Sequence, residues 1–172
     1  EWERYAWIKA RPMRGARGDD LAALARPFVF RKYLDYGAIN AMRELHAQIR
    51  REVARRDMAD NVKLGPGGIR EIEFIAQVFQ LIRGGRDRGL QIRPTLQVLS
   101  LLAERGILGE AAVRELTVAY RFLRNLEHRL QYLDDAQTHM LPGNPEDRAR
   151  IARGMGFNDY AALLEELDDH RA

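Results

Sequence analysis

The 172-residue sequence contains no cysteine, and only three of its 28 basic residues are lysines. Without cysteine the chain can form no disulfide, no thiolate metal site and no cysteine nucleophile, and such a composition suits a reducing cytosol. No apolar run approaches the ~20 residues that a membrane-spanning helix needs. The N-terminus also lacks the basic segment and apolar run of a signal peptide. We therefore expect a cytoplasmic protein without membrane association.

Arginine supplies nearly all of the positive charge, and its planar guanidinium suits bidentate contacts with carboxylates and phosphates. The 25 acidic residues are interleaved with the 28 basic ones, and the formal net charge is +3. This pattern is typical of a mixed, solvated surface rather than of a basic stripe. We therefore do not expect nucleic-acid binding.

Carboxylate pairs occur at Asp19-Asp20 and at Asp134-Asp135. Adjacent residues on a helix do not face the same way, so neither pair is spaced to chelate one metal ion. The sequence also lacks the Gly-Ser loop and Asp-x-Asp strand of a polymerase-β-type nucleotidyltransferase, and it lacks GxSxG, HExxH and Walker A motifs. We therefore expect neither a metal site nor catalytic residues within this chain.

The spacing of apolar residues predicts an all-α protein, a helical bundle of about seven helices with one short, extended, glycine-rich turn. We expect a single helical domain over 1–172, with the main bundle at 19–142 and terminal helices at 146–172. In the longest helix, an apolar seam passes beside Glu127, which we expect to form a surface ion pair with Arg124 or Arg129. The helices are expected at 1–14, 19–25 and 39–56, from Ile69 to a closing glycine at Gly84 or Gly85, and at 94–106, 109–134, 146–153 and 159–170.

Prolines and short polar residues mark several helix ends. Pro12 is expected to end the first helix and Pro27 to limit the second. The apolar cluster from Phe28 to Tyr33 is expected either in the core or at an interface with another domain. N-caps are expected at Asp19 or Asp20, and at Asn158 or Asp159.

The stretch from Asn61 to Phe74, NVKLGPGGIREIEF, interrupts the helical pattern. Its segment Val62–Leu64 alternates like a short strand. The segment Gly65–Gly68 cannot lie inside a helix, because glycine permits positive φ and Pro66 lacks an N–H donor. Helical spacing resumes at Ile69. The sequence therefore predicts a short extended piece, a tight turn and a helix N-terminus with exposed N–H groups.

Glu71 falls on the apolar stripe of the helix that follows, whereas Glu73 and Gln77 fall on its polar side. A carboxylate on an apolar face is costly unless it is paired. In a structural interpretation, Arg70, Lys63 or the N–H groups of the turn pair with Glu71 and pin the turn onto the helix.

In a functional interpretation, the same polar cluster faces an anion. The anion would then contact Lys63, Arg70 and the N–H groups of Gly65, Gly67 and Gly68. The turn matches neither GxGxxG nor Walker A. Both interpretations remain open from the residues alone.

The stretch Lys63–Phe74, together with Gln77–Arg86, resembles the family of the glutamine synthetase adenylyltransferase/adenylyl-removing enzyme. A shorter form of the Gly-Gly-x-Arg-Asp/Glu turn also occurs in the related PII uridylyltransferase, but the longer flanking matches favour the adenylyltransferase. The resemblance covers nearly the whole chain. Its other matching segments are 2–6, 9–11, 26–31, 33–35, 127–131, 135–138 and 141–142.

The resemblance implies a helical domain that follows the first nucleotidyltransferase palm of a longer protein. That half of the enzyme uses phosphate to release ADP from modified glutamine synthetase. Residues 1–14 would be the last helix of the palm or a linker from it. The palm would hold Mg²⁺ and ATP or ADP, and the partners would be glutamine synthetase and the nitrogen-regulatory PII protein.

The same resemblance suggests roles for single residues. Lys9 or Arg11 could reach a nucleotide phosphate, although Lys9 could equally pack its stem on aromatic rings with its head in water. Glu71 would orient Arg70, and Glu73 is a further candidate for such an ion pair. The alternatives are a helical domain of the PII uridylyltransferase type, an interaction module that binds only glutamine synthetase or PII, and, third, a nucleic-acid module.

Overall fold

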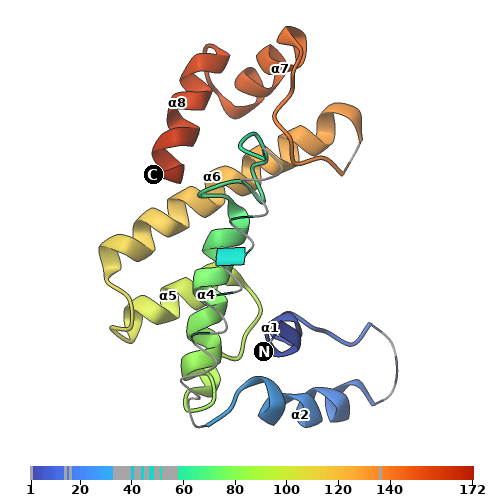
Figure 1. Ribbon diagram of the computed structural model, residues 1–172, viewed down its shortest axis with the longest axis vertical. Helices are drawn as coiled ribbons and strands as arrows, with labels where there is room; N and C mark the ends of the chain where they lie inside the picture. The colour runs from blue at the N-terminus through green and yellow to red at the C-terminus, as the bar shows by residue number, and fades with distance from the viewer. Residues whose placement is uncertain are drawn as a thin grey trace. The chain divides into compact units, whose positions relative to one another are not determined.

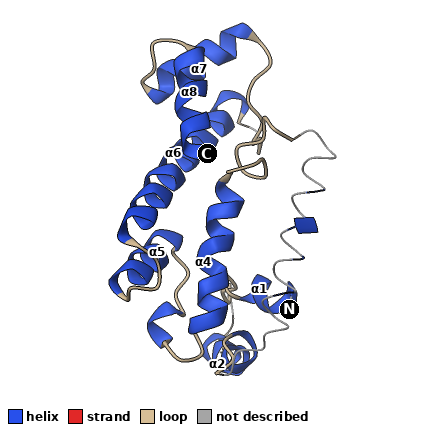
Figure 2. Ribbon diagram, turned by 60° about the vertical axis from the view of Figure 1, so that its left-hand side comes forward, coloured by secondary structure: helices blue, strands red, loops and turns tan. Residues whose placement is uncertain are grey.

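The computed structural model of the chain describes residues 2–13, 15, 17–32, 58–135 and 137–172, with the single positions 40, 44, 47, 48 and 51. These residues contain seven α-helices, one 3₁₀ helix and no β-strand (Figure 2). The all-α prediction is therefore confirmed for the described part, whereas most of the helix predicted at 39–56 lies outside it. The elements in Figure 1 are α1 (Trp2–Trp7), α2 (Gly18–Val29), α4 (Ile69–Arg83), η1 (Arg88–Leu90), α5 (Thr95–Glu104), α6 (Glu110–Asp134), α7 (Pro145–Met155) and α8 (Tyr160–Arg171).

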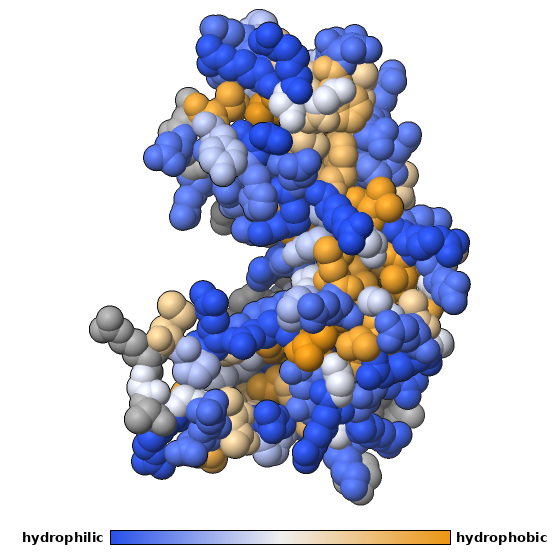
Figure 3. All heavy atoms as spheres, turned by 180° about the vertical axis from the view of Figure 1, so that it is seen from behind, coloured by the Kyte–Doolittle hydropathy of each residue, from blue (hydrophilic) through white to orange (hydrophobic). Residues whose placement is uncertain are grey.

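The chain divides into two compact units. The first unit comprises Glu1–Gln48 and Glu73–Val113, and the second comprises Ile49–Ile72 and Arg114–Ala172. The predicted single domain, with its main bundle at 19–142, stays a prediction. Hydrophilic side chains cover much of the face drawn in Figure 3. No helix among the described residues combines the length and the apolar character that crossing a membrane requires.

Helix α1 ends at Trp7, so the helix predicted over 1–14 is too long at its C-terminal end. The N–H groups of Ile8 and Ala10 donate to carbonyls three residues back, at 3.3 and 3.1 Å, in tighter turns than an α-helix makes. The helix thus ends before Arg11, the residue at which Pro12 disfavours helical backbone. Ile8 lies in the core with only 5% exposure.

Helix α2 continues past Ala25 through Pro27 to Val29, contrary to the prediction. Pro27 lacks the N–H group that would donate to the carbonyl of Ala23, and a helix can continue past one such missing hydrogen bond. The buried guanidinium of Arg4 donates to the carbonyls of Phe28 and Val29, at 3.0 and 3.1 Å. Asp19 and Asp20 lie in the first turn rather than at the N-cap, where Arg17 stands without a side-chain cap.

The core of the first unit joins α1 and α2 to residues of α4. Tyr5, Ile8, Val29 and Leu81 are buried together, and Phe30, Phe74 and Val78 pack against them. Of the predicted apolar cluster, Val29 and Phe30 are thus core residues, whereas Phe28 is 43% exposed and Tyr33 lies outside the described residues.

Two glutamines are buried on the part of α4 that belongs to the first unit. Gln77 is only 5% exposed, so its predicted polar-side position is wrong. Gln80 is fully buried and donates to the carbonyls of Leu90 and Ile92, each at 2.6 Å, which ties α4 to the segment before α5. Backbone acceptors compensate the cost of burying the NH₂ group of Gln80, whereas its buried Oε1 has no hydrogen-bond partner among the described residues.

The second unit is built on α6, α7 and α8. Leu123, Leu126 and Leu130 of α6 are at most 1% exposed, which confirms this part of the predicted apolar seam. Helices α7 and α8 contact each other (Figure 1). Asp159 caps α8 by accepting from the N–H of Ala162 at 2.9 Å, one of the two caps predicted for it.

Candidate functional site

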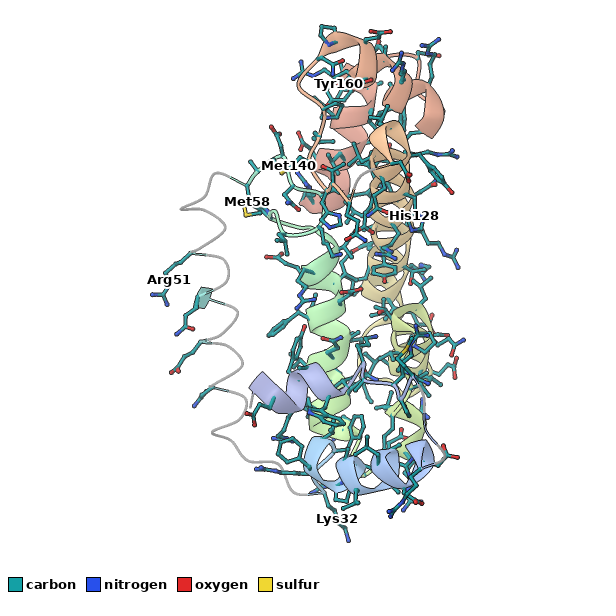
Figure 4. All side chains as sticks on the ribbon, turned by 90° about the vertical axis from the view of Figure 1, so that its right-hand side faces the viewer. Lys32, Arg51, Met58, His128, Met140 and Tyr160 are labelled. Atoms are coloured by element: carbon teal, nitrogen blue, oxygen red, sulfur yellow. The ribbon has the colours of Figure 1, made fainter. Side chains whose placement is uncertain are left out.

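A single antiparallel bridge, Asn61 to Met140, precedes the glycine-rich turn in the second unit. The N–H of Val62 donates to the carbonyl of His139 at 2.9 Å, and the N–H of Leu141 donates to that of Asp60 at 3.0 Å. Figure 4 labels Met58 and Met140 beside this bridge. The predicted extended piece at 62–64 is therefore one bridge at Asn61, followed directly by turns.

The N–H groups of the glycine-rich turn donate within the turn itself. Gly65 donates to the carbonyl of Asn61 at 2.8 Å, and Gly68 donates to that of Gly65 at 3.0 Å. Gly67 donates to the Glu71 carboxylate at 3.2 Å. The prediction of exposed N–H groups is therefore wrong, because these donors are already used to hold the turn in place. A contact of the three glycines with an anion stays a prediction.

The helix start after the turn is closed in the same way. The N–H groups of Ile69 and Arg70 donate to the carbonyls of Val62 and Lys63, at 3.2 and 3.0 Å. The sequence predicted that Arg70, Lys63 or the N–H groups of the turn would pair with Glu71. In the structure, the N–H of Gly67 donates to the half-buried Glu71 carboxylate. The role of Glu71 in orienting Arg70 stays a prediction.

Arg171, at the C-terminal end of α8, holds the chain just before the turn by hydrogen bonds to its backbone. The Arg171 guanidinium donates to the carbonyls of Ala59 and Asn61, at 2.9 and 3.1 Å. Burial lowers the pKa of Arg171, while the carboxylates of Asp168 and Asp60 act in the opposite direction. Asn61 adds a second clamp, because its side-chain oxygen accepts from two N–H groups of the following residues.

Glu127 of α6 is the buried centre of a charged cluster, with its side chain 2% exposed. Its carboxylate lies 2.5 Å from Arg124 Nη1, 3.4 Å from Lys63 Nζ and 3.0 Å from His139 Nδ1. The predicted partner Arg124 is confirmed, but the predicted surface position of Glu127 is wrong. Position 127 lies four residues after Leu123, on the face of α6 that is buried.

The electrostatics of this cluster favour an uncharged imidazole. The pKa of His139 is lowered from its ordinary value of 6.5, first by burial and then by Lys63 and Arg124, while Glu127 raises it. Lys63 and Arg124 then outweigh Glu127 by one positive charge. Glu127 Oε1 and His139 Nδ1 lie 3.0 Å apart, but neither atom makes a hydrogen bond of good geometry among the described residues.

The two cations of the cluster remain accessible to solvent, because the side chains of Lys63 and Arg124 are 32% and 37% exposed. A buried carboxylate that fixes two half-exposed cations leaves a net positive site beside the glycine-rich turn. Such a site can attract an anion and hold it by charge-assisted hydrogen bonds. Sequence reasoning missed His139, because only the bridge at Asn61 brings it to Glu127.

The candidates Lys9, Arg11 and Glu73 belong to the first unit, whereas Lys63, Arg70 and the glycines belong to the second. Lys9 Nζ donates to the Arg93 carbonyl and, at 3.2 Å, to Thr95 Oγ1. Its head is therefore bound to protein rather than free in water. Burial lowers the pKa of Lys9, and Glu73 partly opposes this shift. Glu73 thus acts on Lys9, and a role toward Arg70 stays a prediction.

Among the described residues, no group of three or more histidine, aspartate or glutamate side chains could hold a metal ion. In the charged cluster of Lys63, Arg124, Glu127 and His139, the carboxylate is that of Glu127, and it is paired with Lys63 and Arg124. These residues therefore do not fit Mg²⁺.

The described residues form an all-α segment with a glycine-rich turn, and its class is given by a family model. The model described as GlnD PII-uridylyltransferase matches residues 43–172. This match covers most of the chain, and the chain therefore belongs to that family.

Curated relatives give the more particular resemblance. In Aromatoleum aromaticum, Chromobacterium violaceum and Nitrosomonas europaea they are named bifunctional glutamine synthetase adenylyltransferase/adenylyl-removing enzyme. Identities are 71%, 67% and 60%, over 100%, 99% and 99% of this chain. The chain covers only 18%, 19% and 19% of these relatives, about a fifth of their length. The resemblance to this enzyme and its relation to PII uridylyltransferase are thereby confirmed.

Proposed function

We propose that this chain is the helical domain of an enzyme that adenylylates and deadenylylates glutamine synthetase and so regulates nitrogen assimilation. The names and high identities of the relatives support this proposal. In the proposal, the partners are glutamine synthetase and PII, and a palm outside this chain holds Mg²⁺, ATP or ADP and the catalytic aspartates. The isolated chain would then be inactive, and the complete enzyme would act in the cytoplasm.

The proposal further assigns the domain to the adenylyl-removing half. In that reaction an oxygen of inorganic phosphate bonds to the adenylyl phosphorus and so forms ADP. The bond from this phosphorus to glutamine synthetase breaks, and the group on glutamine synthetase that carried the AMP takes up a proton. Two anionic groups must approach each other, so a fixed cation nearby lowers their repulsion. The proposed role of this chain is to supply that cation.

One observation carries the choice of Lys63 for this role. Its ammonium lies 3.4 Å from buried Glu127, yet its side chain is 32% exposed. The carboxylate therefore positions the ammonium without removing it from solvent. Arg124 and the lowered pKa of His139 leave the cluster with one net positive charge. Arg70, whose backbone is fixed by the Lys63 carbonyl, is the second candidate.

The test uses the complete enzyme, with AMP addition and phosphate-dependent AMP removal measured separately. Arg70→Ala is expected to reduce removal at least about tenfold, while addition and the melting temperature stay near wild type. Lys63→Met is expected to reduce removal by a similar factor with addition retained, and to lower the melting temperature because buried Glu127 loses one of its cations. Arg150→Met is the matched control, because Arg150 is an exposed cation of the same unit that pairs only with surface carboxylates Glu146 and Asp147.

Three results would count against this assignment. Wild-type removal in both variants would exclude a ligand role for Lys63 and Arg70. Loss of both activities with a lowered melting temperature would make the glycine-rich turn purely structural. An equal loss of AMP removal in Arg150→Met would show that removal depends on the overall charge of the protein and not on the position of Lys63 and Arg70.

A second candidate is the PII uridylyltransferase activity that the name of the matched family model carries. In that case the complete enzyme would transfer UMP to PII and leave glutamine synthetase unmodified. Incubation of the complete enzyme with labelled ATP or UTP and each protein substrate separates the two. Labelling of glutamine synthetase from ATP favours the first proposal, and labelling of PII from UTP favours the second.

A further inference from the structure

A pocket of 370 Å³ lies in the first unit between α1, α2 and the segment at 91–93. Its lining includes Ile8 and Val29, which are only 5% and 2% exposed, and the aromatic ring of Phe30. The volume is near the small end of the range of about 300–1,000 Å³ that is usual for ligand pockets. The pocket therefore offers an apolar floor for one small molecule.

Two buried or partly buried cations fix the walls of this pocket. Arg4 of α1 donates to the last carbonyls of α2. Lys9 donates to the carbonyl of Arg93, a lining residue, and to Thr95 at the start of α5. Helix α1 is thereby joined to both other walls. Walls held in this way are preorganised, which lowers the entropic cost of binding a ligand.

The charges around the pocket favour an anion. Its lining contains three arginines, Arg11, Arg26 and Arg93, against one carboxylate, Asp19. Guanidinium groups bind phosphate with two parallel hydrogen bonds, and they do so without losing their own charge. An apolar floor with a guanidinium-rich lining suits a ligand that carries both an apolar body and an anionic group.

Trp7 supplies a surface for a planar ring. Trp7 lines the pocket, and it is 41% exposed. A planar heterocycle can stack on such an indole face, and stacking contributes to affinity beyond the area that it buries. Trp7 and the arginines thus match the two ends of one molecule.

We propose that this pocket binds an organic phosphate with a planar ring, of the size of a nucleoside monophosphate. The inference goes beyond the proposed function, which concerns Lys63 in the second unit. It rests on the apolar floor, the fixed walls and the three arginines, and it does not require AMP removal to depend on Lys63.

Both tryptophans of the chain, Trp2 and Trp7, lie in α1, so intrinsic fluorescence reports on this helix. We would titrate the 172-residue chain with AMP, adenosine and inorganic phosphate. AMP is expected to quench the fluorescence along a saturable curve. Adenosine lacks the phosphate, and inorganic phosphate lacks the ring. Each is expected to bind at least about tenfold more weakly than AMP.

Variants locate the response. Arg26→Met and Arg93→Met are each expected to weaken AMP binding about tenfold. Arg17→Met is the matched control, because Arg17 precedes α2, is 87% exposed, pairs with Asp20 and does not line the pocket. Ala25→Phe fills the pocket without changing its charge and is expected to abolish the AMP response. Lys63→Met is expected to leave it unchanged, which separates this test from that of the proposed function.

The absence of a saturable AMP response in a folded wild-type chain would overturn the proposal. Equal AMP affinities in Arg26→Met, Arg93→Met and Arg17→Met would also overturn it. Inorganic phosphate binding as tightly as AMP would reduce the pocket to a simple anion site and overturn the ring-binding part. Circular dichroism of each variant establishes that these comparisons are made between folded chains.

Discussion

The backbone of Gly67 lies directly against that of Arg171. A Cβ atom at position 67 would come within 2.6 Å of both the Cα and the carbonyl oxygen of Arg171. Gly67 also has φ +62°, in the left-handed region that side chains disfavour. Glycine at this position therefore has a structural role, because it allows the last turn of α8 to lie on the glycine-rich turn.

Gly67→Ala is expected to destabilise the protein more than the backbone conformation alone explains. The left-handed conformation costs an alanine about 1–2 kcal/mol, and the clash with Arg171 adds roughly 1–3 kcal/mol because backbone must move. Gly106→Ala is the matched control, since Gly106 has φ +63° and nothing within 4 Å of an added Cβ. Denaturant unfolding of both variants measures the difference, and equal losses would show that α8 does not pack on Gly67.

Glu127→Gln is expected to lower the free energy of unfolding by roughly 2–4 kcal/mol. Removing one partner of a buried ion pair costs about 3–5 kcal/mol. We expect a smaller loss for Glu127→Gln than for a fully buried pair, because the side chains of Lys63 and Arg124 are 32% and 37% exposed and water can solvate them after the carboxylate is removed. Glu146→Gln removes a carboxylate that is 78% exposed and pairs with Arg150, so its effect should stay within about 0.5 kcal/mol. Similar effects in both variants would mean that the Glu127 cluster does not contribute to stability.

Stability is expected to fall below about pH 6.5 through His139. Its pKa in the folded protein is lowered from the ordinary 6.5 by burial, Lys63 and Arg124. At pH values between the folded and the unfolded pKa of His139, the unfolded chain binds more protons than the folded protein. The free energy of unfolding therefore rises with pH in this range, and it decreases as the pH falls. Thermal melting from pH 5 to 7.5 should show a shallower slope for His139→Asn than for wild type. An unchanged slope would assign the acid sensitivity to other groups.

Lys9→Met is expected to destabilise the protein by about 1–3 kcal/mol. The ammonium donates to the Arg93 carbonyl and to Thr95 Oγ1, and its loss leaves both acceptors without this donor. Thr95→Val removes only one of the two acceptors at nearly constant volume and should cost less. Urea unfolding measures both variants. Wild-type stability of Lys9→Met would mean that the cost of burying the ammonium offsets its hydrogen bonds.

Helix positions followed well from local signals in the sequence. The segment Gly65–Gly68 breaks the helical pattern, and α4 begins at Ile69 as predicted and ends at Arg83. The seam of α6 was visible because leucines recur at helical spacing, and three of them are fully buried. Helix ends were less predictable where tertiary contacts decide them. Helix α2 continues past Pro27 to Val29, and Arg4 donates to the carbonyls of Phe28 and Val29 at its end.

The candidate site followed less well, because it depends on contacts between distant residues. Lys63 and the turn were visible in the sequence, but their partner Glu127 is 64 positions away and was expected at the surface. Burial of Glu127 is favourable only because Lys63, Arg124 and His139 surround it. No local pattern marks His139, since the bridge between Asn61 and Met140 brings it to the cluster.

The clamp formed by Arg171 also sets an order of events during synthesis. Arg171 binds carbonyls that precede it by 112 and 110 residues. At about 5–20 residues per second, a ribosome makes Arg171 roughly 5–20 s after Asn61. Through that interval the segment around Asn61 lacks the two hydrogen bonds from Arg171. The contact of α8 with the segment before the glycine-rich turn can therefore form only after the whole second unit has been made.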